Sequence, residues 1–187
     1  VEFYPEEGKY HYTGHRKCGV VQSPEETRAK GTTCHVCGRP LTVGVLNRVD
    51  QLTSDQLISL TARKKPDGNG VVFNYHPTDE TRPGYVMMVP LLEILAEVRG
   101  VAVGAKQVSE EYERLVNALG SEFEVLLRTP IEKLRVVGGA RLAEAVGKVR
   151  SQDIEILPGY DGEFGKVKIW SLDSARDKSA SEQMGLF

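Results

Sequence analysis

The sequence reads H-R-K-C at residues 15–18 and C-H-V-C-G-R-P-L at residues 34–41. His15 and Cys18 form an H-x2-C pair, and Cys34 and Cys37 form a C-x2-C pair. Two such pairs have the spacing of two chelating turns that close a tetrahedral zinc site. The glycine after the second pair can relax a tight backbone turn. We therefore predict a small zinc-knuckle module with these four ligands, in which zinc is a structural cofactor that folds the segment.

Two other histidines compete for the fourth zinc position. His15 has the right spacing, but His11 and His35 lie close to it in the sequence and stay open as alternatives. All three cysteines of the chain belong to this segment. An odd cysteine count in a charged chain argues against the disulfide framework of a secreted protein.

Length and composition exclude few classes of protein. The 187 residues are enough for one domain or two small ones. A net charge of −2 gives no global basic field of the kind that favours nucleic acid. No apolar run approaches a membrane span and no signal-peptide pattern opens the chain, so we expect a cytoplasmic protein with no membrane partner. Because the chain starts at Val1, we expect a piece of a longer polypeptide.

Apolar periodicity and turn residues predict an α+β fold. Ser23 and Pro24 mark the start of a short helix, and a helical period runs over 41–52. The Gly- and Pro-rich stretch 63–85 is typical of a long connection with one short β-type run. From Asp153 the apolar period becomes two, which predicts a β-hairpin. The expected organisation is a zinc-binding module at 1–52, a linker or flap loop at 53–84, a helical domain at 85–153, a β-hairpin at 154–172 and a flexible tail at 173–187.

The helical domain contains a candidate DNA-binding turn. We predict helices over 90–99, from Ser109, after Ser121 and after Pro130. The segment V-V-G-G-A-R-L at 136–142 then resembles a helix-hairpin-helix element, which presents backbone N–H groups at the start of its second helix to a DNA phosphate. Here two adjacent glycines replace the usual glycine spacing. An ordinary helical hairpin that packs a core is the alternative interpretation.

Basic side chains near the knuckles and the glycine turn are candidate phosphate contacts. A solvated surface without a ligand is the alternative for each of them. Beyond the turn, Tyr160, Phe164 and Trp170 can stack on bases, or they complete a small core. The candidate DNA-binding residues are Arg16, Lys17, Arg39, Gly138, Gly139, Arg141 and Lys148.

The C-terminal tail is polar and ends in an apolar group. Residues 171–182 have no periodicity and should be disordered. The chain then ends Q-M-G-L-F, which resembles the short motif by which DNA-processing proteins dock to sliding clamps. The glutamine would hydrogen-bond at the mouth of a pocket that the apolar side chains fill. The alternative is a C-terminus that packs on its own domain. The candidate clamp-binding residues are Gln183, Met184, Leu186 and Phe187.

Several catalytic signatures are absent. The sequence contains no G-x4-G-K-[ST] phosphate loop and no G-x-S-x-G elbow. Three of the four histidines lie near the zinc segment, so no cluster of histidines and carboxylates remains for a catalytic two-metal site. We therefore expect no catalytic residues in this chain and no catalysis by this chain alone.

Three long runs carry a family resemblance. They are E-F-Y-P-E-E-G-K-Y-H-Y-T-G-H-R-K-C at 2–18, V-P-L-L-E-I-L-A-E-V at 89–98 and G-Y-D-G-E-F-G-K-V-K-I at 159–169. Together they resemble the part of endonuclease Q that follows its catalytic domain. Members of that family couple a metal-dependent phosphoesterase domain of the PHP type to a zinc module and a helical region. They nick DNA on the 5′ side of deaminated bases such as uracil and hypoxanthine, and at abasic sites.

The resemblance implies a role in DNA repair. The PHP domain and its catalytic divalent metals would lie upstream and are absent here, and the expected partners are double-stranded DNA with deaminated or abasic lesions and a sliding clamp. Two function classes stay open. The first is the zinc-containing, DNA-engaging part of a repair endonuclease. The second is a protein-interaction module that docks to a clamp, or an accessory region of a protein labelled as a helicase.

Overall fold

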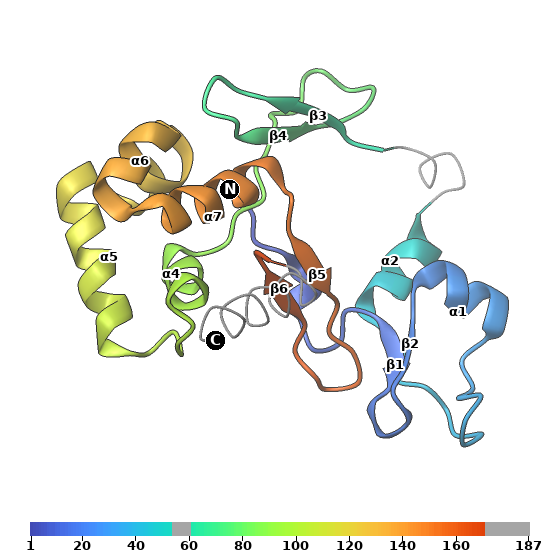
Figure 1. Ribbon diagram of the computed structural model, residues 1–187. Helices are drawn as coiled ribbons and strands as arrows, with labels where there is room; N and C mark the ends of the chain where they lie inside the picture. Colours follow the sequence, from blue (N-terminus) through green and yellow to red (C-terminus); the bar gives the residue numbers. More distant parts are fainter. Residues whose placement is uncertain (54–60, 171–187) are drawn as a thin grey trace, which may run out of the picture. The chain divides into compact units, whose positions relative to one another are not determined.

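The computed structural model describes residues 1–53 and 61–170, and it has the predicted α+β composition. The chain divides into two compact units. The knuckle unit consists of Tyr4–Ala62 and Ile156–Val167. The helical unit consists of Val1–Phe3, Arg63–Glu155 and the described residues from Lys168 onward. Figure 1 labels the helices and strands of both.

The first strand pair of the knuckle unit carries the first knuckle between its strands. Strands β1 (Thr13–His15) and β2 (Val20–Gln22) are antiparallel, and the 3-10 turn η2 (Arg16–Cys18) connects them. Gly19 ends this turn with a φ of 65°, in the left-handed region that favours glycine. The strand pair therefore places the two ends of the first knuckle next to each other.

Helix α1 (Pro24–Lys30) begins where the sequence predicts it. The Ser23 hydroxyl accepts a hydrogen bond from the Glu26 N–H at 3.2 Å, and the Glu26 carboxylate accepts one from the Ser23 N–H at 3.1 Å. This reciprocal pair satisfies two N–H groups that a helix start otherwise leaves without partners. Helix α1 packs against α2 (Val45–Leu52).

The predicted helix over 41–52 begins four residues late. Residues 41–44 are not helical, and Gly44 is the N-cap of α2. Leu41 is buried instead with Val20 and Cys34 in a small apolar cluster. Its side chain contributes to the core of the knuckles, which is why an apolar residue stands there without being part of the helix.

The predicted C-terminal hairpin is present and contributes to the knuckle unit. Strands β5 (Glu155–Leu157) and β6 (Lys166–Lys168) pair as a two-stranded sheet. The Gly159 N–H donates to the carbonyl of Glu6, which lies in the 3-10 turn η1 (Pro5–Glu7), at 2.8 Å. A Cβ on Gly14 would lie 2.5 Å from the Tyr160 ring, so β1 approaches the hairpin loop as closely as only glycine allows.

The helical unit is built from helices that surround one apolar core. Its elements are α4 (Leu91–Arg99), α5 (Lys106–Leu119), the π-helical turn η3 (Glu124–Arg128), α6 (Ile131–Gly138) and α7 (Ala140–Ser151). Helix α7 packs against α4, η3 and α6, and α4 also packs against α5. The side chains that are almost completely buried include Leu91, Ile94, Leu95, Val108, Leu115, Val125, Leu134, Leu142 and Val149.

Of the helix starts predicted at Ser109 and Ser121, the first is misplaced and the second is confirmed. Helix α5 begins at Lys106, so the predicted start at Ser109 is wrong by three residues. Ser121 does act as a cap, because its hydroxyl accepts a hydrogen bond from the Glu124 N–H at 3.2 Å. The helix that follows it is a single π-helical turn.

The stretch 63–85 is more regular than the sequence indicates. Strands β3 (Arg63–Pro66) and β4 (Val72–Tyr75) form an antiparallel hairpin. The Asp67 carboxylate closes the turn by accepting hydrogen bonds from the Asn69 and Val71 N–H groups at 2.8 and 2.9 Å. All four residues of β3 are exposed, so no alternation of apolar and polar residues marks it as a strand.

Two further expectations concern membranes and the tail. No helix in the described part of the chain is both long and apolar enough to cross a membrane. The predicted flexible tail at 173–187, with its clamp motif, lies outside the described residues.

Candidate functional site

The structure brings the four predicted metal ligands together. One ligand atom from each of His15, Cys18, Cys34 and Cys37 lies within 4.8 Å of all the others. The Cys37 sulfur is 3.3 Å from Nδ1 of His15. In a tetrahedral zinc site, a nitrogen and a sulfur ligand lie about 3.5 Å apart, as the usual bond lengths require. The four donor atoms therefore fit one metal ion, with Nδ1 as the histidine donor.

Backbone hydrogen bonds shape the second knuckle. The Cys34 N–H donates to the Arg39 carbonyl, and the Gly38 N–H donates to the Cys34 carbonyl, both at 2.8 Å. Gly38 has a φ of 70°, which confirms that the turn needs the freedom of glycine. Cys34 itself is only 1% exposed. The second knuckle is therefore a tight turn with its first sulfur in the core.

The competing histidines do not join the cluster. In the described part of the chain, the metal-ligand group contains His15 but neither His11 nor His35. The ring of His11 stacks on Tyr12 with 5.4 Å between the ring centroids. His35 is exposed between the two cysteines of the second knuckle. The geometry thus confirms His15, which the spacing favoured, and excludes its two neighbours from the described ligand group.

The thiols of the cluster differ in acidity. Burial raises the pKa of Cys34, but hydrogen bonds with His15 and with the N–H groups of Cys37 and Val36 outweigh it and lower the pKa to about 6. Burial, together with hydrogen bonds to the other two thiols, raises the pKa of Cys18 to about 11. Thiolates are the metal-binding form of cysteine, so one ligand is ready at neutral pH and another must release its proton on binding. Four protein ligands leave no open position for a substrate or a catalytic water.

Asp161 attaches the C-terminal hairpin loop to the knuckles. Its carboxylate accepts a hydrogen bond from the Arg16 N–H at 2.6 Å and one from the Thr42 hydroxyl at 2.5 Å. These bonds lower the pKa of Asp161, that from Thr42 most. Sequence reasoning missed this residue because its partners are 145 and 119 positions away, where no local pattern reveals them.

The candidate DNA-binding residues divide between the two units. Arg16, Lys17 and Arg39 are exposed in the knuckle unit, the first two within η2 and the third after Gly38. Among the aromatic candidates of this unit, the Phe164 ring is exposed and lies under the Lys9 ammonium group at 5.3 Å. The knuckles thus present a basic surface beside the cluster.

The remaining candidates lie at the junction of α6 and α7. Gly139 connects the two helices with a φ of 86°. A Cβ on Gly138 would lie 2.3 Å from Cδ2 of Leu142, so the turn is tightly packed. Arg141 is exposed in the first turn of α7, whereas Lys148 forms an ion pair with an aspartate at 2.5 Å.

Trp170 packs on the exposed side of α7. The Arg141 guanidinium lies 4.5 Å from the centroid of its ring. Its indole N–H donates to the Glu144 carboxylate at 2.8 Å. Of the two readings that the sequence left open for this residue, the contacts support the packing role.

Arg150 is not part of a basic surface. It follows Lys148 by two positions in α7, but it is only 1% exposed. Its guanidinium donates hydrogen bonds to the carbonyls of Asn69, Val125, Leu126 and Thr129. Burial lowers its pKa. The side chain therefore serves the packing of the helical unit.

Solved structures show what this arrangement is similar to. The lesion-specific endonuclease PfuEndoQ from Pyrococcus furiosus matches 94% of this chain with a TM-score of 0.67 and 27% sequence identity. This chain is similar to endonuclease Q. A second endonuclease Q structure, a complex with a 27-mer duplex substrate with an abasic lesion at the active site, matches 89% of the chain with a TM-score of 0.63 and 29% identity. The family resemblance read from the sequence is confirmed.

The similarity covers only part of each relative. The chain spans 40% and 37% of the two endonuclease Q chains. It is 29% identical over 163 residues to the uncharacterized protein MJ0043 of Methanocaldococcus jannaschii and spans 18% of that protein. It is 30% identical over 162 residues to the uncharacterized protein YqxK of Bacillus subtilis and spans 33% of it. Residues 90–153 match the family model described as the MJ0043 C-terminal domain.

Proposed function

We propose that this chain is the zinc-containing, DNA-engaging C-terminal part of a repair endonuclease that nicks 5′ to deaminated bases and abasic sites. The observation that carries the proposal is the match of 94% of the chain to a lesion-specific endonuclease. Since the chain spans 40% of that protein, we assign the chemistry and its catalytic divalent metals to a PHP domain outside this chain. A cytoplasmic location, where thiols stay reduced, belongs to the same proposal.

Zinc is the metal that we assign to the cluster. Three sulfurs and one imidazole nitrogen form a donor set that structural zinc sites use. Bound zinc would hold β1, η2 and the second knuckle together, because the ligands come from separate segments. Metal analysis of the purified chain should find about one zinc per chain. A knuckle unit that melts cooperatively without zinc would contradict this assignment.

The proposed DNA contacts are made to phosphates. The Ala140 N–H and the side chains of Arg141 and Lys148 supply donors at the start and along the side of α7. The Gly139 N–H, which the sequence offered as a further donor, is already bonded to the Arg135 carbonyl at 3.0 Å. The knuckles supply the exposed side chains of Arg16, Lys17 and Arg39. Such contacts are nearly independent of sequence and weaken steeply with salt.

Binding of fluorescent duplexes across a salt series tests these contacts. We expect the chain to bind duplexes with uracil, hypoxanthine or an abasic site, and Arg141→Glu to weaken binding to all of them alike. Lys106→Glu is the matched control, because Lys106 is exposed in α5, away from the α6–α7 junction. If the Arg141→Glu variant and the wild type bind DNA with equal affinity, the α6–α7 junction does not contact DNA and serves only in packing.

Catalysis is tested with the same chain. Incubation with magnesium or manganese and a uracil-containing duplex should give no nicks, because we place the water-activating metals outside this chain. Specific nicking 5′ to uracil by the purified chain would contradict the assignment of the catalytic metals to a domain outside it.

The C-terminal sequence Q-M-G-L-F supports a second candidate function, docking to a sliding clamp. Gln183 would hydrogen-bond at the mouth of a pocket that Leu186 and Phe187 fill, with Met184 beside them. A short peptide pays an ordering cost, so its affinity should be on the order of micromolar. Titration of a purified clamp with this peptide tests the idea, and the peptide with both Leu186 and Phe187 changed to Ala is the control. Equal binding of the two peptides would exclude the motif.

A further inference from the structure

The β3–β4 hairpin has a face on which basic and aromatic side chains are opposite each other. In its antiparallel register, Arg63 is opposite Tyr75 and Lys65 is opposite Phe73. Directly opposed residues lie on the same face of a sheet, as do residues two apart along a strand. The rings of Phe73 and Tyr75 accordingly stack, with 6.3 Å between their centroids. We call these four residues the basic–aromatic face.

On the other face of the hairpin, the central residue of β4 is buried. Asn74, which alternates with the two aromatic residues, is only 4% exposed, and it exchanges backbone hydrogen bonds with Tyr85 at 2.8 and 3.0 Å. The basic–aromatic face lies on the opposite side of the hairpin from the Asn74 side chain, and there Arg63 and Lys65 are exposed while Phe73 and Tyr75 are exposed in part.

The backbone of Gly84 contacts the Tyr75 ring. A Cβ on Gly84 would lie 2.5 to 2.9 Å from three atoms of the Tyr75 ring, so the ring rests directly on the backbone of that glycine. A hollow of about 470 Å³ lies beside it, lined by Arg63, Lys64, Lys65 and Tyr75. An aromatic ring that is supported on one side and borders an open hollow can accept another flat group on its free side.

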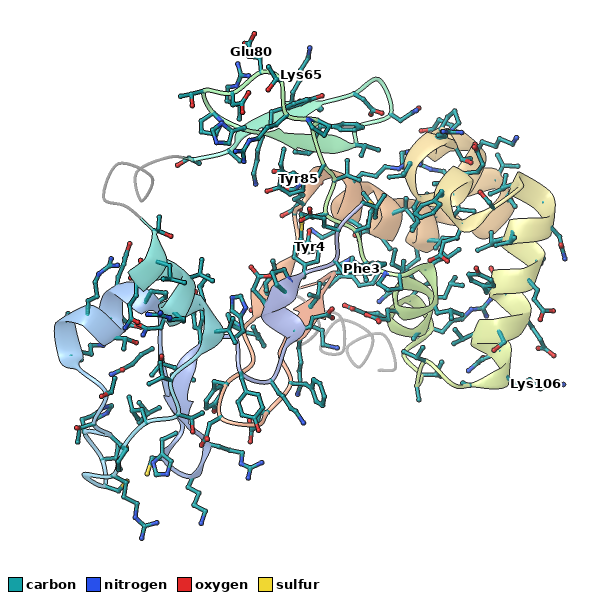
Figure 2. The ribbon with its side chains drawn as sticks, turned by 180° about the vertical axis from the view of Figure 1, so that it is seen from behind. Phe3, Tyr4, Lys65, Glu80, Tyr85 and Lys106 are labelled. Carbon is teal, nitrogen blue, oxygen red and sulfur yellow. The ribbon has the colours of Figure 1, made fainter. Side chains whose placement is uncertain are left out.

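The charges of this hollow are mostly uncompensated. Arg63 forms an exposed ion pair with Glu80 at 3.4 Å, but Lys64 and Lys65 have no ion pair within the described residues. Figure 2 labels the Lys65 and Glu80 side chains at this hairpin. The neighbouring carboxylates are engaged elsewhere, Asp67 with the turn of the hairpin and Asp79 with the side chains of the next loop. The hollow thus favours an anion.

We propose that the basic–aromatic face binds an unpaired DNA strand, which adds a substrate site to the DNA-engaging role proposed above and rests on it. The cations would contact successive phosphates, and the rings of Phe73 and Tyr75 would stack on bases. Proteins that bind single strands combine a positively charged groove with aromatic stacking platforms in this way. A base pair in a duplex hides the faces of its bases in the stack, so the rings select for unpaired nucleotides.

Fluorescence anisotropy with a single-stranded oligothymidylate and with a blunt undamaged duplex tests the proposal. Tyr75→Leu should weaken single-strand binding about tenfold and change duplex binding by less than about twofold, because only the former loses a stacked base. Lys65→Gln should lower the slope of log affinity against log salt by about 0.7 on the single strand. Lys106→Gln, which removes one exposed charge from α5, should change neither property.

A second variant tests the position of the ring without removing it. Gly84→Ala pushes a methyl group into the space of the Tyr75 ring, so it should weaken single-strand binding while duplex binding stays the same. Melting curves establish that each variant is folded. Unchanged single-strand affinity in the Tyr75 and Lys65 variants overturns the hairpin site and leaves the proposed function standing. Equal weakening on both DNAs overturns the stacking role, and a wild-type chain that binds neither DNA overturns both proposals.

Discussion

At the scale of single residues, Asp161 connects parts of the chain that are far apart in the sequence. Its carboxylate accepts hydrogen bonds from the Arg16 backbone beside the metal cluster and from Thr42 after the second knuckle. The residue has a φ of 45°, a left-handed conformation that aspartate and asparagine tolerate better than most residues. This position therefore requires both a residue that tolerates a positive φ and a carboxylate that accepts two hydrogen bonds.

Asp161→Ala should destabilise the knuckle unit by about 1–2 kcal/mol, because hydrogen bonds to a charged group are worth about 1.5–3 kcal/mol and water replaces part of that here. Asp161→Asn should cost less, since it keeps one acceptor oxygen and tolerates the same φ. Urea unfolding, followed by NMR signals of the knuckle unit, measures the difference. Equal stability of the wild type and the alanine variant would contradict this role.

The same carboxylate makes a prediction about pH. Hydrogen bonds from Thr42 and Arg16 lower the pKa of Asp161 in the folded state. Its contribution to stability is therefore complete above the ordinary aspartate pKa of about 3.9 and is lost as the pH falls through the lowered value. Comparing the wild type with Asp161→Asn in urea between neutral and acidic pH checks this, because the stability difference should shrink at the acidic end.

In the helical unit, Arg150 likewise connects parts of the chain that are far apart in the sequence. Its guanidinium satisfies the carbonyls of Val125, Leu126 and Thr129 at the end of η3, where helical carbonyls lack partners of their own. Arg150→Met keeps much of the volume but leaves these carbonyls buried without a donor. We expect a loss of at least about 2 kcal/mol.

Arg135→Met in α6 is the matched control for this change. Its side chain is exposed and meets Glu132 only at 3.8 Å, so the change should alter stability by less than about 0.5 kcal/mol. Chemical unfolding of both variants provides the comparison. Similar stabilities would show that the buried arginine is dispensable.

At the scale of elements, the α6–α7 junction depends on one glycine. Gly139 has φ 86° and ψ 166°, a region that is nearly restricted to glycine and costs other residues about 1–3 kcal/mol. Gly147 lies within α7, where an added Cβ would meet only Cδ1 of Ile131 at an ordinary 3.8 Å.

The two glycines therefore predict opposite effects of the same substitution. Gly139→Ala should destabilise the helical unit by about 1–3 kcal/mol because of backbone strain. Gly147→Ala should stabilise it by about 0.5–1 kcal/mol, because alanine has the higher helix propensity. Thermal unfolding followed by circular dichroism measures both. If both variants changed stability in the same direction, the junction would not have the conformation described here.

At the scale of the whole molecule, the two compact units have different sources of stability. The knuckle unit has a small apolar cluster of Val20, Cys34 and Leu41 beside the metal ligands. The helical unit has an extensive apolar core and, within its described residues, no comparable metal-ligand group. Small units with little apolar core commonly depend on a metal.

Cys34→Ser should therefore unfold the knuckle unit and leave the helices of the helical unit largely intact. NMR signals of 4–53 should collapse toward random-coil positions, while the helical circular dichroism signal should remain in large part. Val36→Ser is the matched control, because Val36 is 61% exposed between the two ligands and should keep both zinc and fold. Loss of all helical signal in the Cys34 variant would mean that the units do not fold separately.

Features that depend on near neighbours in the chain could be predicted from the sequence. The ligand pairs at His15 and Cys34, the cap at Ser23 and the C-terminal hairpin are local, because chelating turns, caps and tight turns require particular residues at short spacing. The position of the α6–α7 turn follows from its glycines for the same reason. The metal-ligand set was thus determined by the sequence up to the choice among three histidines.

The tertiary structure decided what depends on distant partners. It selected His15 over its competitors, buried Leu41 in the core of the knuckles and enclosed Arg150 among carbonyls. It also made a strand of Arg63–Pro66, which carries no apolar pattern of its own and is stabilised by pairing with β4. A local pattern cannot specify these outcomes, because burial and hydrogen bonding depend on which remote segments the folded chain brings within contact distance.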